Sequence, residues 1–338
     1  MLKREPAAVC RPARRCAVRN LALLGLLVLA AAGCGGGTTP AATGPTIGFV
    51  QLLESAQLNL GYDGFRQALS DSGYVDGKTV TIDYRCAQGD LTAVPLILDR
   101  FVQERVALIG TNTTPCMLAA AQKVRDIPVV ITVTFGPREN GITTVPPNLT
   151  GYYDDCDAGP LLAVMRECLP GLTTIGIPYS SGEANAVYAA GKVREAAAAM
   201  GITVLLQPIT TVNELRDATL ALAGQGAQAL VLVSDNAVYA SIDALLPVAR
   251  ERQLPVFGTD PEVVRQGAAV GWGVDFYDWG YASGQVAAAL LGGSAMTDVP
   301  LRFCAVQQLL VSEANARSQG MTIPAGVLAR AKRLPPLP

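Results

Sequence analysis

The 338-residue sequence contains no histidine. This absence excludes Ser/His/Asp triads, Cys/His dyads, histidine zinc sites and an imidazole switch near neutral pH. Charged residues make up only 16% of the chain and aromatic residues only 6%, whereas half of the residues are apolar. With 34 glycines and 22 prolines, this composition is typical of α/β proteins with short loops between buried elements. It excludes a disordered chain and a long helical rod.

Catalytic motifs are also missing. The chain has no nucleophile elbow, phosphate-binding loop or dinucleotide-binding fingerprint, and its glycine-rich stretch at residues 33–37 comes before the first expected strand. Paired carboxylates can in principle hydrolyse glycosides, but no arrangement of residues in the sequence points to a reaction class. We therefore expect that the protein is not an enzyme and that it uses no cofactor and no metal.

Residues 1–33 have the features of an export signal. Six basic residues precede an unbroken apolar run, Leu21–Ala32, which is shorter than the ~20 residues that a membrane span needs. Small residues then lead into Cys34, an ending that resembles a bacterial lipobox. We expect cleavage before Cys34 and acylation of this residue, followed by a flexible tether at residues 34–45. An uncleaved membrane anchor is the alternative.

The charge balance disfavours nucleic acid as a partner. Loss of the signal removes six basic residues and one acidic residue, so the remaining chain is more acidic than the net charge of −2 of the whole sequence. An acidic chain has no electrostatic reason to bind a polyanion. We expect an exported protein that a lipid attaches to the bacterial cell envelope, on the periplasmic or the outer face of the membrane.

Five cysteines remain beyond Cys34, and none of them forms a CxxC motif. A thioredoxin-like redox site and a tetrathiolate metal site are therefore disfavoured. Cys156 and Cys168 flank an expected helix, which would hold them too far apart for a disulfide. In an oxidising compartment, the sequence-based prediction is that two pairs form and one cysteine stays free. The expected pairs are Cys86 with Cys116 and Cys156 with Cys304.

From Thr46 onward, short apolar runs alternate with amphipathic stretches. The first series has expected strands at residues 46–50, 80–84, 107–110 and 128–132, and expected helices at 58–72, 91–104 and 115–124. After residue 151 a second series has expected strands at 174–177, 204–207, 229–233, 255–257 and 271–274, and expected helices at 182–200, 212–223, 236–252 and 261–267. This repetition predicts two α/β halves with parallel sheets. Ligands of open α/β sheets bind beyond the carboxyl ends of the strands, in the cleft.

Seven short motifs follow one another in the order and spacing of a known family. They are Gly73-Tyr74-Val75-Asp76-Gly77-Lys78, Ile82-Asp83-Tyr84, Ala87-Gln88-Gly89-Asp90, Asp126-Ile127-Pro128-Val129-Val130, Asn148-Leu149-Thr150-Gly151, Gly182-Glu183-Ala184-Asn185 and Gly273-Val274-Asp275-Phe276-Tyr277. Over residues 46 to about 324, the sequence resembles the extracytoplasmic substrate-binding lipoproteins of ABC importers. The branch it resembles contains bacterial tryptophan- and phenylalanine-binding proteins.

The resemblance implies the fold of a type I periplasmic binding protein, with two Rossmann-like lobes joined by a three-crossing hinge. By similarity, the crossings fall near Tyr152–Asp157, Asp275–Trp279 and Phe303–Gln307. The first lobe would contain residues 46–153 and about 277–304, and the second lobe residues 154–276 and about 305–338. The implied partners are a small-molecule ligand, an ABC permease and its ATPase, and the protein is expected to be a monomer.

Polar residues follow the third expected strand of the first half, where Asn112, Thr113 and Thr114 lead into a helix. We expect Thr114 to be the N-cap of this helix, with Pro115 in the first turn. A helix N-terminus offers free N–H groups and partial positive charge, and the threonines add hydroxyl donors, so a carboxylate can bind here without a lysine. An ordinary helix cap without a ligand is the alternative.

Two strand ends of the second half supply acidic residues, Asp235 and Asp260. A ligand ammonium enclosed in a cleft needs a carboxylate partner, because burial of an unpaired charge is prohibitive. Each aspartate is alternatively a simple N-cap, and Phe135 is either a platform for a ligand ring or a core residue. The complete set of expected ligand-binding residues is Gln51, Ser55, Asn112, Thr113, Thr114, Thr134, Phe135, Ser181, Asn185, Asp235 and Asp260.

These observations predict a solute-binding lipoprotein that binds an amino acid or a related carboxylate between its lobes and delivers it to a permease. Two alternatives stay open. One is a ligand sensor for a signalling receptor, and the other is a binder of a different solute, such as a nucleoside or a sugar.

Overall fold

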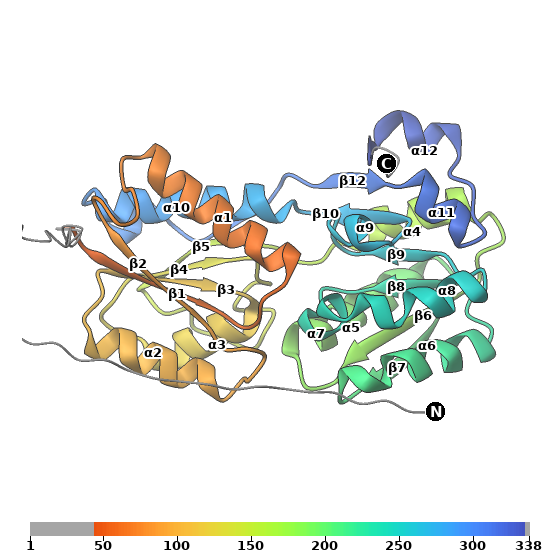
Figure 1. Cartoon of the computed structure of the whole chain (residues 1–338), viewed down its shortest axis with the longest axis horizontal. Coiled ribbons are helices and arrows are strands. Elements are labelled where there is room, and N and C mark those ends of the chain that lie inside the picture. Colours follow the sequence, from red (N-terminus) through yellow and green to blue (C-terminus); the bar gives the residue numbers. More distant parts are fainter. Residues whose placement is uncertain (1–43, 335–338) are drawn as a thin grey trace, which may run out of the picture. The chain divides into compact units, whose positions relative to one another are not determined.

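The computed structural model describes residues 44–334. The expected signal, Cys34 and most of the expected tether lie outside the described residues. All of the described residues belong to one compact unit, in which two sheets form two α/β lobes (Figure 1). None of the helices within residues 44–334 is long and apolar enough to cross a membrane.

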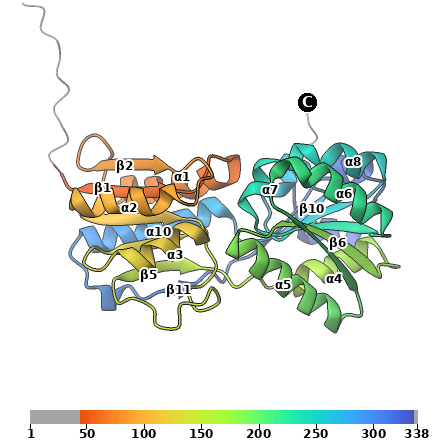
Figure 2. The same ribbon diagram turned by 90° about the horizontal axis from the view of Figure 1, so that it is seen from below.

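The sheet of the first lobe has six parallel strands in the order β11-β5-β4-β3-β1-β2. The strands are β1 (Thr46–Gln51), β2 (Thr81–Cys86), β3 (Leu108–Asn112), β4 (Val129–Thr132), β5 (Leu149–Tyr153) and β11 (Arg302–Phe303). Figure 2 shows β2 and β11 at opposite edges of this sheet. The helices that cover it are α1 (Ala56–Asp71), α2 (Ala93–Gln103), α3 (Thr114–Lys123) and α10 (Phe276–Leu291).

Helices α1 and α10 lie on one face of this sheet, and α2 and α3 lie on the other (Figure 1). Successive side chains of a strand point to opposite faces, so the central strands of a sheet that is covered on both sides are largely apolar. In β1, Phe49 packs against Phe65 of α1, with 5.1 Å between the ring centroids, whereas the next residue, Val50, belongs to the apolar cluster of Phe101 in α2. Strand β1 is accordingly buried throughout, apart from its first residue.

Helix α10 comes late in the chain and returns to the first lobe, where it packs closely against α1. The close approach depends on glycine. A Cβ atom at Gly280 would lie 1.9 Å from the carbonyl oxygen of Gly61, and one at Gly64 would lie 2.1 Å from the carbonyl oxygen of Tyr277. Side chains at these positions would force the two helices apart.

The sheet of the second lobe has the strand order β13-β12-β10-β9-β8-β6-β7. Its pairs are parallel except for β10 with β12. The strands are β6 (Thr174–Ser180), β7 (Thr203–Ile209), β8 (Ala229–Leu232), β9 (Val256–Gly258), β10 (Val270–Gly273), β12 (Gln308–Val311) and β13 (Lys332–Arg333). The α/β fold with two lobes and mainly parallel sheets, which the sequence predicts, is confirmed.

Eight α-helices accompany the second sheet within the described residues. They are α4 (Gly159–Cys168), α5 (Ala184–Ala199), α6 (Leu215–Gly224), α7 (Asn236–Ala240), α8 (Leu246–Glu251), α9 (Val263–Gln266), α11 (Glu313–Ser318) and α12 (Ala325–Arg330). Short 3₁₀ turns occupy Val212–Glu214, Ile242–Ala244 and Met296–Asp298. The single helix predicted at 236–252 is wrong, because a 3₁₀ turn separates α7 from α8 and proline stands in the first turn of α8.

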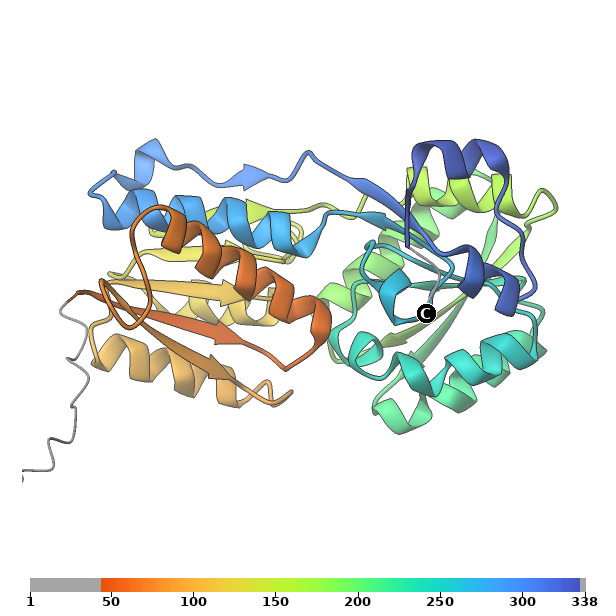
Figure 3. The ribbon, with the colours of Figure 1, turned by 45° about the horizontal axis from the view of Figure 1, so that its top comes forward.

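Three segments connect the lobes. Strand β5 leads into α4 through residues 154–158, β10 leads into α10 through residues 274–275, and β11 leads into β12 through residues 304–307. The strands of the first sheet point with their carboxyl ends toward the second lobe (Figure 3). Loops that follow these strands therefore meet the other lobe, and this arrangement positions the site described below.

The predicted disulfides are not formed, because all five described cysteines are free thiols. Cys116 packs inside the cluster beneath α2 and α3, whereas Cys86, at the end of edge strand β2, is half-buried and lies 3.4 Å from the backbone nitrogen of Gln88. Cys156 belongs to the core of the second lobe, but Cys304 packs in a separate cluster near the connecting segments. The two members of each expected pair thus lie in different surroundings.

Candidate functional site

A cavity lies between the two lobes, and its volume is about 40 Å³. This is smaller than the roughly 300–1,000 Å³ of common small-molecule sites. The residues that line it come from both lobes and from two connecting segments. They are Leu58, Thr113, Thr114, Val133, Thr134, Phe135, Asp154, Asn185, Ser234, Asp235, Asn236, Tyr239, Thr259, Asp260, Val274, Phe276 and Trp279. Seven of the eleven residues expected from the sequence are among them.

The N-terminus of α3 forms part of the first-lobe wall. The helix begins at Thr114, and Thr113 is its N-cap, one residue before the expected position. Thr113 has φ = 95° and ψ = 152°, a region that favours glycine and is strained for a β-branched residue. Its hydroxyl is buried and has no hydrogen-bond partner. The chain therefore holds an unpaired hydroxyl at the start of this helix at an energetic cost.

Thr114 and Thr134 form a hydrogen-bonded pair beside this helix start. The Thr114 hydroxyl oxygen lies 3.1 Å from that of Thr134 and accepts a hydrogen bond from the backbone N–H of Phe135 at 3.2 Å. The side chain of Thr134 is also 3.0 Å from the carbonyl oxygen of Phe135. These contacts bond the loop after β4 to the start of α3.

Asp235 lines the second-lobe wall, but both of its carboxylate oxygens already accept hydrogen bonds within the protein. One carboxylate oxygen accepts hydrogen bonds from the Val238 N–H at 2.9 Å and from the Ser180 hydroxyl at 3.0 Å, and the other accepts from the Ser180 N–H at 2.5 Å. It is the N-cap of α7. Burial, and the negative charge of Glu183, raise its pKa. The contacts of Asp235 are therefore explained by its role as an N-cap, which was the alternative to ligand binding.

Asp260 keeps one oxygen free. Its Oδ1 accepts hydrogen bonds from the backbone N–H groups of Glu262 at 3.0 Å and Val263 at 3.3 Å, but its Oδ2 is buried without a partner. The residue is 1% exposed, and this burial raises its pKa to about 7. The hydroxyl of Tyr239 opposes this shift and lowers the pKa. A donor on a ligand would satisfy the free oxygen.

Asn185 adds a further acceptor from the second lobe. Its amide group donates to the carbonyl oxygen of Ser234 at 2.8 Å, and its Oδ1 is buried without a partner. The neighbouring Glu183 does not line the cavity, because its carboxylate accepts from the side-chain amide of Asn236 at 2.6 Å and from the Ala237 N–H at 3.1 Å. The unpaired acceptors of this wall are therefore Asp260 and Asn185.

Asp154 is a cavity residue that the sequence analysis missed. It follows β5 in the first connecting segment, where its backbone N–H donates to Thr134 at 3.0 Å and its carbonyl accepts from Gly136 at 3.2 Å. The side chain is 6% exposed, and its Oδ1 has no partner. Burial raises its pKa to about 6. The available signal was its place directly after a strand in an expected crossing.

The cavity is unbalanced in charge. Its described lining includes three carboxylates and no lysine or arginine. An ionised carboxylate in a buried site needs a positive or hydrogen-bonding partner. Apolar side chains complete the walls, namely Leu58, Val133, Phe135, Val274, Phe276 and Trp279. This combination suits a ligand that carries a positive group on an apolar body.

Four expected residues do not line the cavity. Asn112 donates to the side-chain oxygen of Gln51 and to the carbonyl oxygen of Leu58, both at 2.8 Å, so Asn112 and Gln51 stabilise the loop after β1. Ser55 is the N-cap of α1. The exposed Ser181 contacts the carbonyl oxygen of Ile209 at 3.2 Å. The structure thus gives these four side chains structural partners in place of access to the cavity.

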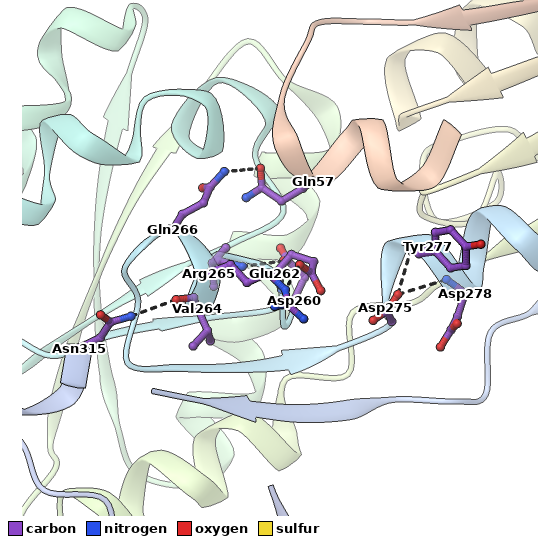
Figure 4. A network of polar contacts seen from close by, with 11 residues as sticks. Gln57, Asp260, Glu262, Val264, Arg265, Gln266, Asp275, Tyr277, Asp278 and Asn315 are labelled. Atoms are coloured by element: carbon purple, nitrogen blue, oxygen red, sulfur yellow. Dashed lines mark hydrogen bonds and ion pairs between the residues drawn. The ribbon is translucent and has the colours of Figure 1, made fainter. Parts of the chain in front are cut away.

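The two lobes contact each other around the cavity. Gln266, at the end of α9, donates to Gln57 of α1 at 2.7 Å, as Figure 4 shows. The ring of Phe135, from the loop after β4, packs against Tyr188 of α5, with 5.2 Å between the ring centroids. Gln57 is 2% exposed and Phe135 is 4% exposed. The lobes are therefore closed on the cavity.

Comparisons with known proteins agree with this architecture. A tyrosine-binding protein of Clostridioides difficile is 28% identical over 279 residues, which are 81% of each chain. The solved structure of a conserved domain protein from Vibrio cholerae is 28% identical, with a TM-score of 0.81. The structure of an ABC domain from Streptococcus pneumoniae in complex with L-Trp is 22% identical, with a TM-score of 0.78. Both matches cover 86% of this chain and 99% of the other.

A ligand-free, open substrate-binding protein of Clostridium difficile with adhesive properties is 28% identical but has a TM-score of only 0.64, over the same share of both chains. The family model for ABC transporter substrate binding proteins matches residues 46–334. Members of this family are extracytoplasmic proteins that bind small molecules and do not transform them. The chain belongs to the ABC transporter substrate-binding protein family, with the fold of a type I periplasmic binding protein.

Proposed function

We propose that the protein is a solute-binding lipoprotein of an ABC importer and that its ligand is an amino acid. The observation that carries this proposal is the set of buried unpaired groups in one cavity. The unpaired Oδ2 of Asp260 can accept a hydrogen bond from a ligand ammonium group. The start of α3 and the Thr113 hydroxyl offer donors to a ligand carboxylate. Permease and ATPase partners follow from the family.

The ligand carboxylate binds at the N-terminus of α3. The first N–H groups of a helix have no partner within the helix, and together with the helix dipole they favour an anion. The unpaired Thr113 hydroxyl adds one donor at the same place. No lysine or arginine lines the described cavity, so this helix start is the part of the wall that suits a negative group.

The ligand ammonium binds on the second lobe, between Asp260 and Asn185. Each of these residues has a buried oxygen without a partner, and an ammonium group has three donors. Hydrogen bonds that involve a charged group contribute about 1.5–3 kcal/mol each. The ligand thus joins a first-lobe group to a second-lobe group, which stabilises the closed arrangement of the lobes.

The side chain of the ligand is aromatic. Val274, Phe276 and Trp279 supply apolar surface on one side of the cavity, and rings pack well against such surface. The similar proteins described above are named as a tyrosine-binding protein and as a complex with L-Trp. Tyrosine and tryptophan are therefore the first ligands to test.

A thermal-shift screen tests the ligand class. The protein from Gly35 onward is melted with amino acids, sugars, nucleosides and small carboxylates. An aromatic amino acid should raise Tm saturably, because a ligand at a hundred times its Kd adds about 2.7 kcal/mol to the free energy of unfolding. Thr113→Ala and Asp260→Ala should each weaken binding by about 2 kcal/mol. A rise with sugars or nucleosides, and none with amino acids, would overturn the proposal.

The lipid attachment is tested separately. Acylation of Cys34 would place the protein on the membrane, because a lipid chain adds about 0.8 kcal/mol per buried CH₂ group. Cys34→Ser should leave ligand binding unchanged and move the protein from the membrane fraction to the soluble fraction. A Cys34→Ser variant that stays in the membrane fraction would show that another element attaches it.

A further inference from the structure

Asp154 is a buried acceptor that the proposed binding of ammonium and carboxylate leaves unused. Its Oδ1 has no hydrogen-bond partner, and 94% of the residue surface is withdrawn from solvent, since it is 6% exposed. Both backbone groups of Asp154 are bonded to the loop after β4, so its backbone is held beside the cavity. A buried carboxylate oxygen without a partner is costly, and a ligand donor would remove this cost.

The position of Asp154 differs from that of Asp260. Asp154 lies in the segment that follows β5 of the first sheet, whereas Asp260 follows β9 of the second sheet. The two carboxylates are therefore carried by different sheets. Burial is the main cause of the raised pKa of each.

Asp154 lies on the apolar side of the cavity. The backbone carbonyl of Tyr152, two residues earlier, accepts a hydrogen bond from the indole N–H of Trp279 at 2.9 Å. Cys304, whose pKa is raised by burial and then by Asp154, packs in one apolar cluster with Val274, Phe276 and Trp279, among others. A ligand side chain in contact with this cluster therefore ends near a carboxylate.

We infer that Asp154 is a specificity-determining residue, which accepts a hydrogen bond from a donor on the aromatic side chain of the ligand and so selects tyrosine or tryptophan over phenylalanine. This inference rests on the proposed function. A phenol O–H and an indole N–H are donors, whereas the ring of phenylalanine has none. Phenylalanine would leave the Asp154 oxygen buried and unpaired, which is how a polar site rejects an analogue that lacks a donor.

Calorimetric titration of the wild-type protein with tyrosine, tryptophan and phenylalanine at pH 8 tests this inference. At that pH both Asp154 and Asp260 are ionised, because the pKa values are about 6 and about 7. We expect tyrosine or tryptophan to bind about ten- to a hundredfold more tightly than phenylalanine, which is the range for a hydrogen bond to a charged group. Asp154→Ala should remove most of this preference by weakening the donor ligand and leaving phenylalanine within about threefold.

Two further variants serve as controls. Asp157→Asn removes a charge three residues away at an exposed position outside the cavity lining, and it should leave all three affinities unchanged. Asp260→Asn should weaken the three ligands by the same factor, because all of them carry the ammonium group. Melting curves of each variant establish that it is folded.

The outcomes separate the two claims. If no amino acid binds the wild-type protein, the proposed function fails and the inference fails with it. If amino acids bind but phenylalanine binds as tightly as tyrosine and tryptophan, only the inference is overturned. A parallel loss of all three ligands in Asp154→Ala would assign Asp154 to the ammonium group and would also overturn it.

Discussion

The pKa of Asp260 should couple ligand binding to pH. Burial raises this pKa from the usual 3.8 to about 7, so the ligand-free protein protonates Asp260 as the pH falls below neutrality. An ammonium group needs the ionised form and must displace this proton. Each pH unit below the pKa therefore costs a factor of ten in affinity, or about 1.4 kcal/mol. From pH 8 to pH 5, the affinity for tyrosine should fall about a hundredfold.

The stability of the ligand-free protein should change in the opposite direction. The folded state binds the Asp260 proton more tightly than the unfolded state does, so this group adds stability that is complete below pH 3.8 and is lost as the pH rises through about 7. Between these values the free energy of unfolding should decrease by up to about 1.4 kcal/mol per pH unit. Asp154, with its pKa raised to about 6, acts in the same direction below pH 6.

Titration calorimetry and urea unfolding at pH 5, 6, 7 and 8 measure both effects. Asp260→Asn is the matched variant, since its Oδ1 can still accept from the N–H groups of Glu262 and Val263. In this variant the pH dependence of both quantities should flatten above pH 6. Wild-type affinity that stays constant from pH 8 to pH 5 would refute the reasoning, as would an Asp260→Asn protein with an unchanged slope.

Three substitutions probe other features of the structure. Thr113→Gly should raise the free energy of unfolding of the ligand-free protein by about 1 kcal/mol, because glycine accepts φ = 95° without strain. The same substitution should weaken ligand binding, because the hydroxyl is lost. A variant less stable than the wild type would contradict the strain at Thr113. Gln266→Ala removes the 2.7 Å bond to Gln57 and should accelerate tyrosine dissociation about fivefold in stopped-flow experiments, whereas an unchanged rate would show that the bond does not hold the lobes together. Gly280→Ala places a Cβ atom 1.9 Å from the Gly61 oxygen and should cost about 2 kcal/mol or more in thermal unfolding; an unchanged Tm would contradict the close packing of α1 and α10.

The rule that ligands bind beyond the carboxyl ends of parallel strands located much of the cavity wall from the sequence. Thr113, Thr134 and Asp260 follow three different strands and line one cavity. The same rule failed for Gln51 and Asn112, which are the last residues of β1 and β3 and lie opposite each other in the strand register. Their side chains bond to each other, and no sequence pattern reports this pairing.

The role of Asp235 shows a second limit of strand-end reasoning. Asp235 and Asp260 occupy equivalent places after two strands, and the sequence gives both the same two interpretations. The structure separates them because the Ser180 N–H and hydroxyl come from a neighbouring strand and saturate Asp235, while Oδ2 of Asp260 has no partner. Contacts between residues far apart in the chain decide which carboxylate is free.

Phe135 connects ligand affinity to a balance between conformations. It belongs to the chain of the first lobe but packs in the hydrophobic core cluster of the second lobe. Separation of the lobes would return its side chain to water, and burial of a phenylalanine contributes about 1.5–3 kcal/mol. This burial favours the closed form of the empty protein, and the apparent Kd is the intrinsic value divided by the population of that form. Substitutions of Phe135 during evolution can thus change the ligand affinity of this receptor. They would do so by changing the fraction of the empty protein that is closed.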